Sequence, residues 1–251
     1  MRSDSEATTP ASSSGKPASD RLVLVTNGCS GLGLVCARRL ASEHDLILVS
    51  SSRDPDPERG RDQQRQAIEE LRSSGATGAL MFEMADLSEP GSAQELRGRL
   101  KASGALDRLY AIVHVSESDE GAPFLQESRK SFEECMERHF FSAVNLSSEF
   151  VPDLVRNRRG RVIVIGSGAE SRRRSSSAYA ASMSALETLV RSLAGEVGAS
   201  GVTVNGLRSG PVLASWVAFL LSDAASVING NILTEQNSSF AFNPNPPNPN
   251  E

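Results

Sequence analysis

Short runs of apolar residues alternate along the chain with longer stretches in which apolar and polar residues recur at helical spacing. A short apolar run between turn residues is typical of a strand buried on both faces, and the helical spacing is typical of an amphipathic helix. The predicted strands are Arg21–Thr26, Leu46–Val49, Ala79–Phe82, Leu109–His114, Arg161–Ile165, Val202–Leu207 and Asn231–Leu233. The predicted helices are Leu32–Glu43, Arg61–Ser74, Ser92–Ser103, Phe132–Arg156, Ser176–Ala199 and Ala214–Ser222.

This repeated order of strand and helix predicts an α/β fold. We expect a Rossmann-type, doubly wound parallel sheet of about seven strands with helices on both faces. The chain has 251 residues, 39% of them hydrophobic, which is enough to bury one core, so residues 20–237 are predicted to form a single domain. Residues 1–19 are predicted to be a flexible leader rich in Ser, Thr and Pro, and residues 238–251 a loose Asn/Pro-rich tail.

The bulk composition argues against several kinds of partner. A net charge of -5 without a basic face is unlike a nucleic-acid-binding protein. No apolar run reaches the roughly 18 residues of a membrane span, and the N-terminal segment lacks the apolar core of a signal peptide. The three cysteines form neither a C-x-x-C pair nor a zinc spacing. We therefore expect a cytoplasmic protein with no metal site, no membrane partner and no nucleic-acid partner.

A glycine-rich turn follows the first predicted strand. It reads TNGCSGLG, residues 26–33, and leads directly into the first predicted helix. Glycines at such a junction let the backbone approach a pyrophosphate, while the helix N-terminus offers free N–H groups and the positive end of its dipole. The position of the turn predicts a dinucleotide site, and a tight turn that holds no ligand stays the alternative.

This turn and the later motifs resemble the short-chain dehydrogenase/reductase family over almost the whole of residues 20–237. The family's turn reads T-G-x-x-x-G-x-G, and Asn27 replaces its first glycine. Asparagine tolerates a positive φ better than most residues. The resemblance implies a nicotinamide dinucleotide at this turn. The turn residues expected to hold it are Thr26, Asn27, Gly28, Ser30, Gly31, Leu32 and Gly33.

Residues after the second and third strands indicate which dinucleotide is bound. In an NAD enzyme an acidic residue at the end of the second strand hydrogen-bonds the adenosine ribose. Here the sequence is SSSRD, with Ser51 at that place and Arg53 just beyond it. Ser51 and Arg53 favour NADP, with an incidental arginine on a solvated loop as the alternative. Asp86, in MADLSEP, stands at the family's D-[LV] and should lie by the adenine.

The resemblance also implies a catalytic tetrad of which two positions are altered. Ser167, in GRVIVIGSGAE, stands where the family has the serine that polarises the substrate oxygen. Tyr179, in SSSAYAASM, stands where the family has the tyrosine that donates or accepts the proton. Met183 occupies the lysine position, one helical turn after Tyr179, and His139 occupies the asparagine position.

The loss of the lysine changes the expected chemistry. An ammonium about 5 Å from a phenol favours the phenolate by roughly 3 kcal/mol at an effective dielectric of about 20. With Met183 in its place, Tyr179 should stay protonated at neutral pH, which harms alcohol oxidation more than carbonyl reduction. Met183 would contact the cofactor through apolar packing alone. His139 is expected to act as a base or in a proton relay, with a packed helix histidine as the alternative.

Two further regions depart from the family's pattern. His114 lies in AIVHVSES, where the family has N-N-A-G, and Glu117 follows nearby. After the sixth predicted strand the chain passes from Pro211 almost directly into the next helix, so the flap that covers substrate and nicotinamide in the family is missing. We expect a cleft that is open, shallow or covered by a partner subunit, because such a lid normally completes the site.

These residues leave three functions open. The first is an NADP-dependent reductase of a carbonyl or keto group on a small organic molecule, natural products included. The second is a non-redox cyclase, isomerase or lyase in which Ser167, Tyr179 and His139 are the acid–base groups. The third is a non-catalytic binding module. The resemblance also implies a homodimer or homotetramer formed through the helices at 132–156 and 176–199.

Overall fold

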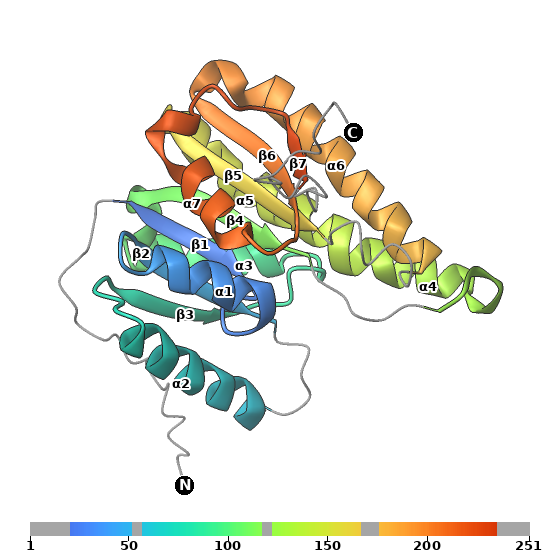
Figure 1. The fold of residues 1–251 in the computed structure, drawn as a ribbon, viewed down its shortest axis with the longest axis horizontal. Helices are drawn as coiled ribbons and strands as arrows, with labels where there is room; N and C mark the ends of the chain where they lie inside the picture. The colour runs from blue at the N-terminus through green and yellow to red at the C-terminus, as the bar shows by residue number, and fades with distance from the viewer. Residues whose placement is uncertain (1–20, 52–56, 117–121, 167–175, 235–251) are drawn as a thin grey trace, which may run out of the picture.

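A computed structural model describes residues 21–51, 57–116, 122–166 and 176–234 (Figure 1). Seven parallel strands form one sheet in the order β3-β2-β1-β4-β5-β6-β7. The strands are β1 (Leu22–Thr26), β2 (Asp45–Ser50), β3 (Leu80–Met84), β4 (Leu109–Val115), β5 (Gly160–Gly166), β6 (Val202–Arg208) and β7 (Ile232–Thr234). The α-helices are α1 (Gly31–Leu40), α2 (Pro57–Ser73), α3 (Ser92–Ala102), α4 (Arg129–Cys135), α5 (Ser142–Arg156), α6 (Ser177–Val197) and α7 (Leu213–Leu221).

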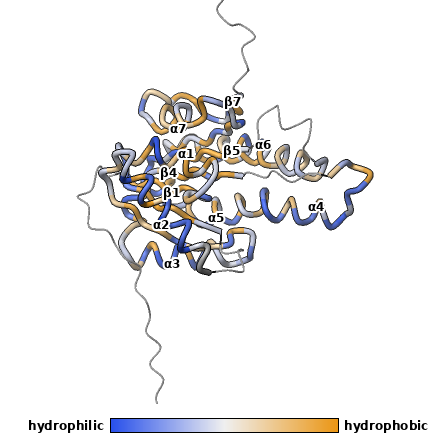
Figure 2. Tube along the Cα trace, turned by 60° about the horizontal axis from the view of Figure 1, so that its bottom comes forward, coloured by the Kyte–Doolittle hydropathy of each residue, from blue (hydrophilic) through white to orange (hydrophobic). Residues whose placement is uncertain are grey.

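Helices cover both faces of the sheet, which confirms the predicted doubly wound α/β fold. One core lies between the sheet and helices α3, α5 and α6, and contains Leu96, Phe150 and Val190. The other lies between the sheet and helices α1, α2 and α7, and contains Leu71 and Val217. Because both faces are covered, strands β1, β2 and β4 are buried along their whole length, and Figure 2 shows the apolar residues concentrated there.

The strand order reverses between β1 and β4, which places a crevice at their carboxyl ends. From β1 the chain proceeds outward to β2 and β3, then returns to add β4 on the other side of β1. Val25 of β1 pairs with Leu48 of β2 and with Val113 of β4. In open parallel sheets, ligands bind at such a reversal, beyond the carboxyl ends of the strands.

The predicted helix Phe132–Arg156 is divided into three helical segments. Helix α4 runs into a π-helical turn, η3 (Met136–Phe141), and then into α5. The Ser142 hydroxyl donates to the carbonyls of Arg138 and His139, at 2.8 and 3.1 Å, where the wider turn alters the helical hydrogen bonds. The sequence pattern did not predict this turn, which carries His139.

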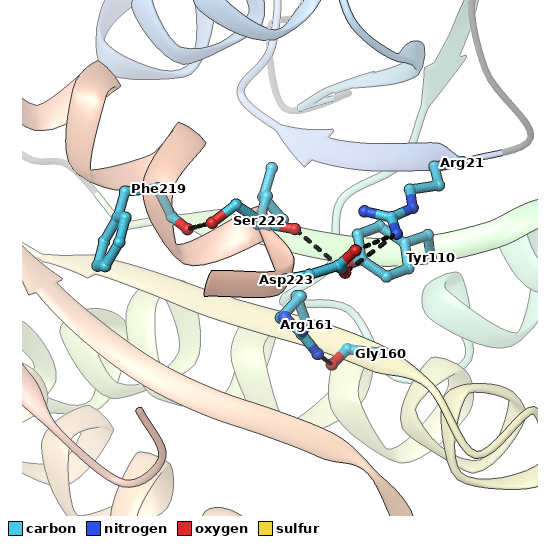
Figure 3. A network of polar contacts seen from close by, with 8 residues as sticks. Arg21, Tyr110, Gly160, Arg161, Phe219, Ser222 and Asp223 are labelled. Carbon is cyan, nitrogen blue, oxygen red and sulfur yellow. Dashed lines mark hydrogen bonds and ion pairs between the residues drawn. The ribbon is translucent and has the colours of Figure 1, made fainter. Parts of the chain in front are cut away.

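A network of polar contacts closes the opposite, amino-terminal edge of the sheet (Figure 3). The Arg21 guanidinium donates to both carboxylate oxygens of Asp223, at 3.0 and 3.1 Å, and lies 4.5 Å from the centre of the Tyr110 ring. The Tyr110 hydroxyl donates to the carbonyl of Leu221 at 2.8 Å. These contacts tie strands β1 and β4 to the end of helix α7. They stabilise the amino-terminal ends of the strands, whereas the crevice lies at the carboxyl ends.

None of the helices among the described residues is long and apolar enough to cross a membrane.

Candidate functional site

A cavity of about 160 Å³ lies at the carboxyl ends of strands β1 to β4. Its walls come from the ends of these strands, from the segment after β3 and from the π-helical turn η3. The polar residues that line it are Thr26, Asn27, Ser50, Ser51, Asp86, Ser88, His114, Ser116, Arg138, His139 and Ser142. In the part of the chain that the structure describes, no group of His, Cys, Asp or Glu side chains is suited to hold a metal ion.

The glycine turn has the conformation that a close approach to a ligand requires. Asn27 has a φ of 52° and Gly31 a φ of 51°, so both lie in the left-handed region. A Cβ added to Gly33 would lie 2.1 Å from the carbonyl oxygen of Asn27. The Asn27 side chain donates to the carbonyl of Val115 at 3.1 Å, which holds the turn against strand β4. Asparagine therefore serves at the position of the first glycine, because its side chain supports the conformation that the turn needs.

Hydrogen bonds and packing hold the remaining residues of the turn. Ser30 is the N-cap of helix α1, and the Gly28 N–H donates to the carbonyl of Val49 at 3.3 Å. Thr26 Oγ accepts from the Val115 N–H at 2.8 Å, and Leu32 packs against the core beneath helices α1 and α7. The turn is thus anchored to both neighbours of strand β1.

Ser51 and Asp86 line the same cavity from strand β2 and from the segment after β3. The Asp86 carboxylate accepts from the backbone N–H of Ser88 at 3.1 Å and from its hydroxyl at 2.6 Å. Ser51 is exposed at the rim. A ligand in the cavity would meet a fixed carboxylate on one side and a small hydroxyl on the other.

Tyr179 and His139 lie in direct contact. Tyr179 is 1% exposed, and its hydroxyl donates to the carbonyl of Ser116 at 3.2 Å. Its ring meets the His139 ring edge-on, with the ring centres 4.9 Å apart. Ser176 caps helix α6 by accepting from the Tyr179 N–H at 3.0 Å, and the Glu127 carboxylate accepts from the Ser177 N–H at 3.1 Å. A carboxylate and a hydroxyl at the helix N-terminus therefore fix Tyr179 in place.

Met183 lies outside the cavity, against the end of strand β5. A Cβ added to Gly166 would lie 2.9 Å from the Met183 sulfur, and the side chain packs against the core. Glu187, one turn further along helix α6, accepts from Arg208 at 2.7 Å. The position at which the family carries its lysine is thus apolar here and borders a salt bridge.

Two histidines line the cavity, and each is hydrogen-bonded to hydroxyl groups. The His139 Nδ1 and the Ser116 Oγ lie 2.8 Å apart. The His114 Nδ1 lies 3.3 Å from the Thr26 Oγ, and its Nε2 lies 3.3 Å from the Ser142 Oγ. Burial lowers the pKa of His114 to about 4, although a hydrogen bond to the His139 backbone partly opposes this shift. His114 is therefore neutral at physiological pH.

The cavity contains polar residues that the sequence did not single out. Ser116, Arg138 and Ser142 line it. Ser116 lies in the segment AIVHVSES quoted above, but only its neighbours His114 and Glu117 were named there. Of these three lining residues, only Ser116 could have been recognised from the sequence, because it directly follows a buried strand at the sheet edge where ligands bind.

Several predicted residues lie outside the described part of the chain. They are Ser167, Arg53 and Glu117.

Comparison with known proteins agrees with this geometry. The sequence model of the short chain dehydrogenase family matches residues 21–224. The chain is 27% identical over 207 residues to the uncharacterized oxidoreductase YvrD of Bacillus subtilis, covering 82% of this chain and 74% of that one. It is 28% identical over 195 residues to a 2,3-dihydroxy-2,3-dihydro-p-cumate dehydrogenase of Pseudomonas putida, covering 75% of this chain and 70% of that one. The fold is similar to a crystal structure of levodione reductase, with a TM-score of 0.75 at 20% identity over 86% of this chain and 96% of that one.

Proposed function

Because the chain belongs to the short-chain dehydrogenase family, we propose that it binds NADPH and reduces a carbonyl group on a small organic substrate. The observation that carries the proposal is the glycine turn at the β1–β4 reversal. Gly33 leaves no room for a Cβ against the Asn27 carbonyl, and the turn opens onto a cavity lined by Ser51 and Asp86. Such a backbone cradle at a helix N-terminus suits a pyrophosphate.

The residues present fit the adenosine half of the cofactor. The turn and the first N–H groups of helix α1 would hold the pyrophosphate, and Asp86 would lie beside the adenine. Ser51 offers a hydroxyl where an NAD enzyme carries a carboxylate, so it would not repel a ribose 2′-phosphate. The nicotinamide, when bound, supplies the hydride.

Tyr179 would supply the proton in this reduction. Its hydroxyl now donates to the carbonyl of Ser116, and a substrate carbonyl would take over as the acceptor of that hydrogen bond. The Met183 side chain adds no positive charge beside Tyr179, which favours the protonated donor form. Proton donation to a carbonyl is therefore the direction of reaction that these residues support.

The substrate side of the site would admit molecules of varied size. Strand β6 ends at Arg208 and helix α7 begins at Leu213, so a short connection replaces the family's substrate flap.

We expect NADPH to bind more tightly than NADH, by about tenfold or more, when each is titrated into the protein in a calorimeter. Ser51→Asp is the matched variant: a carboxylate facing the 2′-phosphate costs about 1–2 kcal/mol, which should remove the preference for NADPH and leave the binding of NADH intact. Ser51 is exposed, so the unfolding temperature should not change. No binding of either dinucleotide would refute hydride transfer.

The contacts among Ser116, His139 and Tyr179 favour a second candidate function, acid–base catalysis without net redox change. The three residues touch one another pairwise, and Ser116 and His139 line the cavity. Isomerisation, cyclisation or elimination needs such proton donors and acceptors but no hydride. Product formation by protein freed of nucleotide would favour this candidate, and a strict requirement for NADPH would favour reduction.

The protein would act as a homo-oligomer that pairs through the helices at 132–156 and 176–199. A groove of about 450 Å³ runs between helices α5 and α6. Its apolar lining residues are Val144, Val151, Pro152, Val155, Leu189, Leu193 and Val197. An apolar groove between two long helices suits the same two helices of a second copy.

Leu193→Arg is expected to convert the oligomer into a monomer, because a charged guanidinium would have to lose its water against the apolar side chains of the groove. Molar mass from light scattering measures the change. Ala102→Arg adds the same charge at an exposed position on helix α3 and should leave the oligomer intact. A wild-type chain that already has the mass of a monomer would contradict the proposal.

A further inference from the structure

We infer that Ser116 and His139 form an acid–base pair on the cavity wall, in which the Ser116 hydroxyl meets the ligand and His139 holds the proton. The Ser116 Oγ and the His139 Nδ1 are 2.8 Å apart, well within hydrogen-bonding distance. Both residues line the cavity, and they are only 4% and 2% exposed. A hydroxyl paired with an imidazole in this way is the arrangement that general acid–base catalysis requires.

Hydrogen bonds fix both backbone polar groups of Ser116, its N–H and its carbonyl. Its N–H donates to the carbonyl of Ile165 on strand β5 at 2.8 Å, and its carbonyl accepts from the Tyr179 hydroxyl at 3.2 Å. The Tyr179 ring also packs edge-on against His139. Tyr179 thus positions both members of the pair, and the geometry of the pair is set before a ligand arrives.

His139 is better suited than His114 to hold the proton. Hydroxyl groups lie within 3.3 Å of both ring nitrogens of His114, whereas the hydroxyl of Ser116 lies beside Nδ1 of His139. His139 lies in the π-helical turn, a form of helix that is frequent at functional sites. The other charged or titratable groups facing this region are Arg138 and Asp86 on the cavity wall and Tyr179 on helix α6.

The proton transfer balances without a further reactant. The Nδ1 of neutral His139 accepts the Ser116 proton while the Ser116 Oγ accepts a proton from a ligand hydroxyl, which leaves an imidazolium and a ligand oxyanion. In the reverse direction the imidazolium returns its proton through Ser116 to an oxyanion or a carbonyl oxygen. The ligand class is therefore a molecule with an alcohol, enol or carbonyl group. This inference rests on the acid–base candidate function for its substrate, but the state of the pair can be measured without one.

The test is nitrogen–proton correlation spectroscopy of the histidine rings in the full chain. The chain has three histidines, so His44→Gln and His114→Gln assign their signals. The inference requires neutral His139 to carry its proton on Nε2, with Nδ1 as the acceptor from Ser116. A neutral His139 ring protonated on Nδ1 would overturn it.

Ser116→Ala should lower the pH at which His139 titrates by about one unit, because the imidazolium loses the oxygen that accepts its Nδ1–H. Ser116→Thr keeps the hydroxyl and should restore the wild-type titration. Ser50→Ala is the matched control, because the Ser50 hydroxyl is buried at the same cavity and lies beside Cys29 rather than His139. An unchanged titration in Ser116→Ala would overturn the inference. Failure to bind NADPH would instead refute the reductase and leave this result intact.

Discussion

Replacing Gly33 by alanine is expected to weaken NADPH binding on the order of 100-fold and to lower the free energy of unfolding. The added Cβ would lie 2.1 Å from the Asn27 carbonyl oxygen and 2.8 Å from the Thr26 carbonyl oxygen, so backbone rather than a flexible side chain would have to move. Crowding of this kind costs about 1–3 kcal/mol. Displacement of even one charge-assisted hydrogen bond to the pyrophosphate would cost a further 1.5–3 kcal/mol or so, which means a loss of affinity on the order of 100-fold.

Calorimetric titration with NADPH and thermal unfolding measure the two effects separately. Gly98→Ala is the control, because Gly98 lies in helix α3 with nothing within 4 Å of an added Cβ. That change should stabilise the fold by about 0.5–1 kcal/mol and leave NADPH binding unchanged. A Gly33→Ala protein that binds NADPH as the wild type does would show that the turn is not the binding site.

Restoring a lysine in Met183→Lys is expected to tighten NADPH binding by about 10- to 100-fold and to raise the rate of carbonyl reduction. One charged hydrogen bond to the ribose is worth about 1.5–3 kcal/mol, which is the source of that range. Position 183 lies one turn beyond Tyr179 on the same face of helix α6, at the end of strand β5. The new ammonium would also favour the ionised form of Tyr179, so alcohol oxidation should gain more than carbonyl reduction.

A neighbouring carboxylate would oppose this gain in NADPH affinity. Glu187, one turn further along helix α6, can draw a lysine at position 183 away from the ligand, although it already pairs with Arg208. Met183→Leu keeps the apolar packing without the charge and should bind NADPH as the wild type does. Equal affinities in the Lys and Leu variants would mean that position 183 does not reach the cofactor and that the lysine alignment is wrong.

The sheet was predictable because its central strands are covered on both faces. Such strands are nearly continuous apolar runs, so their positions are visible in the sequence alone. Strand β4, predicted as Leu109–His114, extends to Val115, and strand β5, predicted as Arg161–Ile165, gains one glycine at each end. The glycine turn was equally visible, since its conformation depends on local backbone requirements at Asn27, Gly31 and Gly33.

The polar wall of the cavity could not be predicted in the same way. The contact between Ser116 and His139 joins a strand end to a helix, and it depends on how the π-helical turn rotates His139 toward the sheet. That turn has no sequence signal as strong as a proline or a glycine. The family motifs named His139 as a candidate, whereas the contact between its imidazole and the Ser116 hydroxyl became apparent only in three dimensions.

The link between strands β1 and β4 limits how the protein can move. At the reversal of strand order, the Thr26 Oγ accepts from the Val115 N–H, and the Asn27 side chain donates to the Val115 carbonyl. Both side chains cross from the glycine turn to β4 beyond the last paired residues of the two strands. The halves of the sheet therefore cannot separate like two domains around a hinge. Any opening and closing during a catalytic cycle must come from segments above the sheet edge, while the floor of the crevice stays rigid.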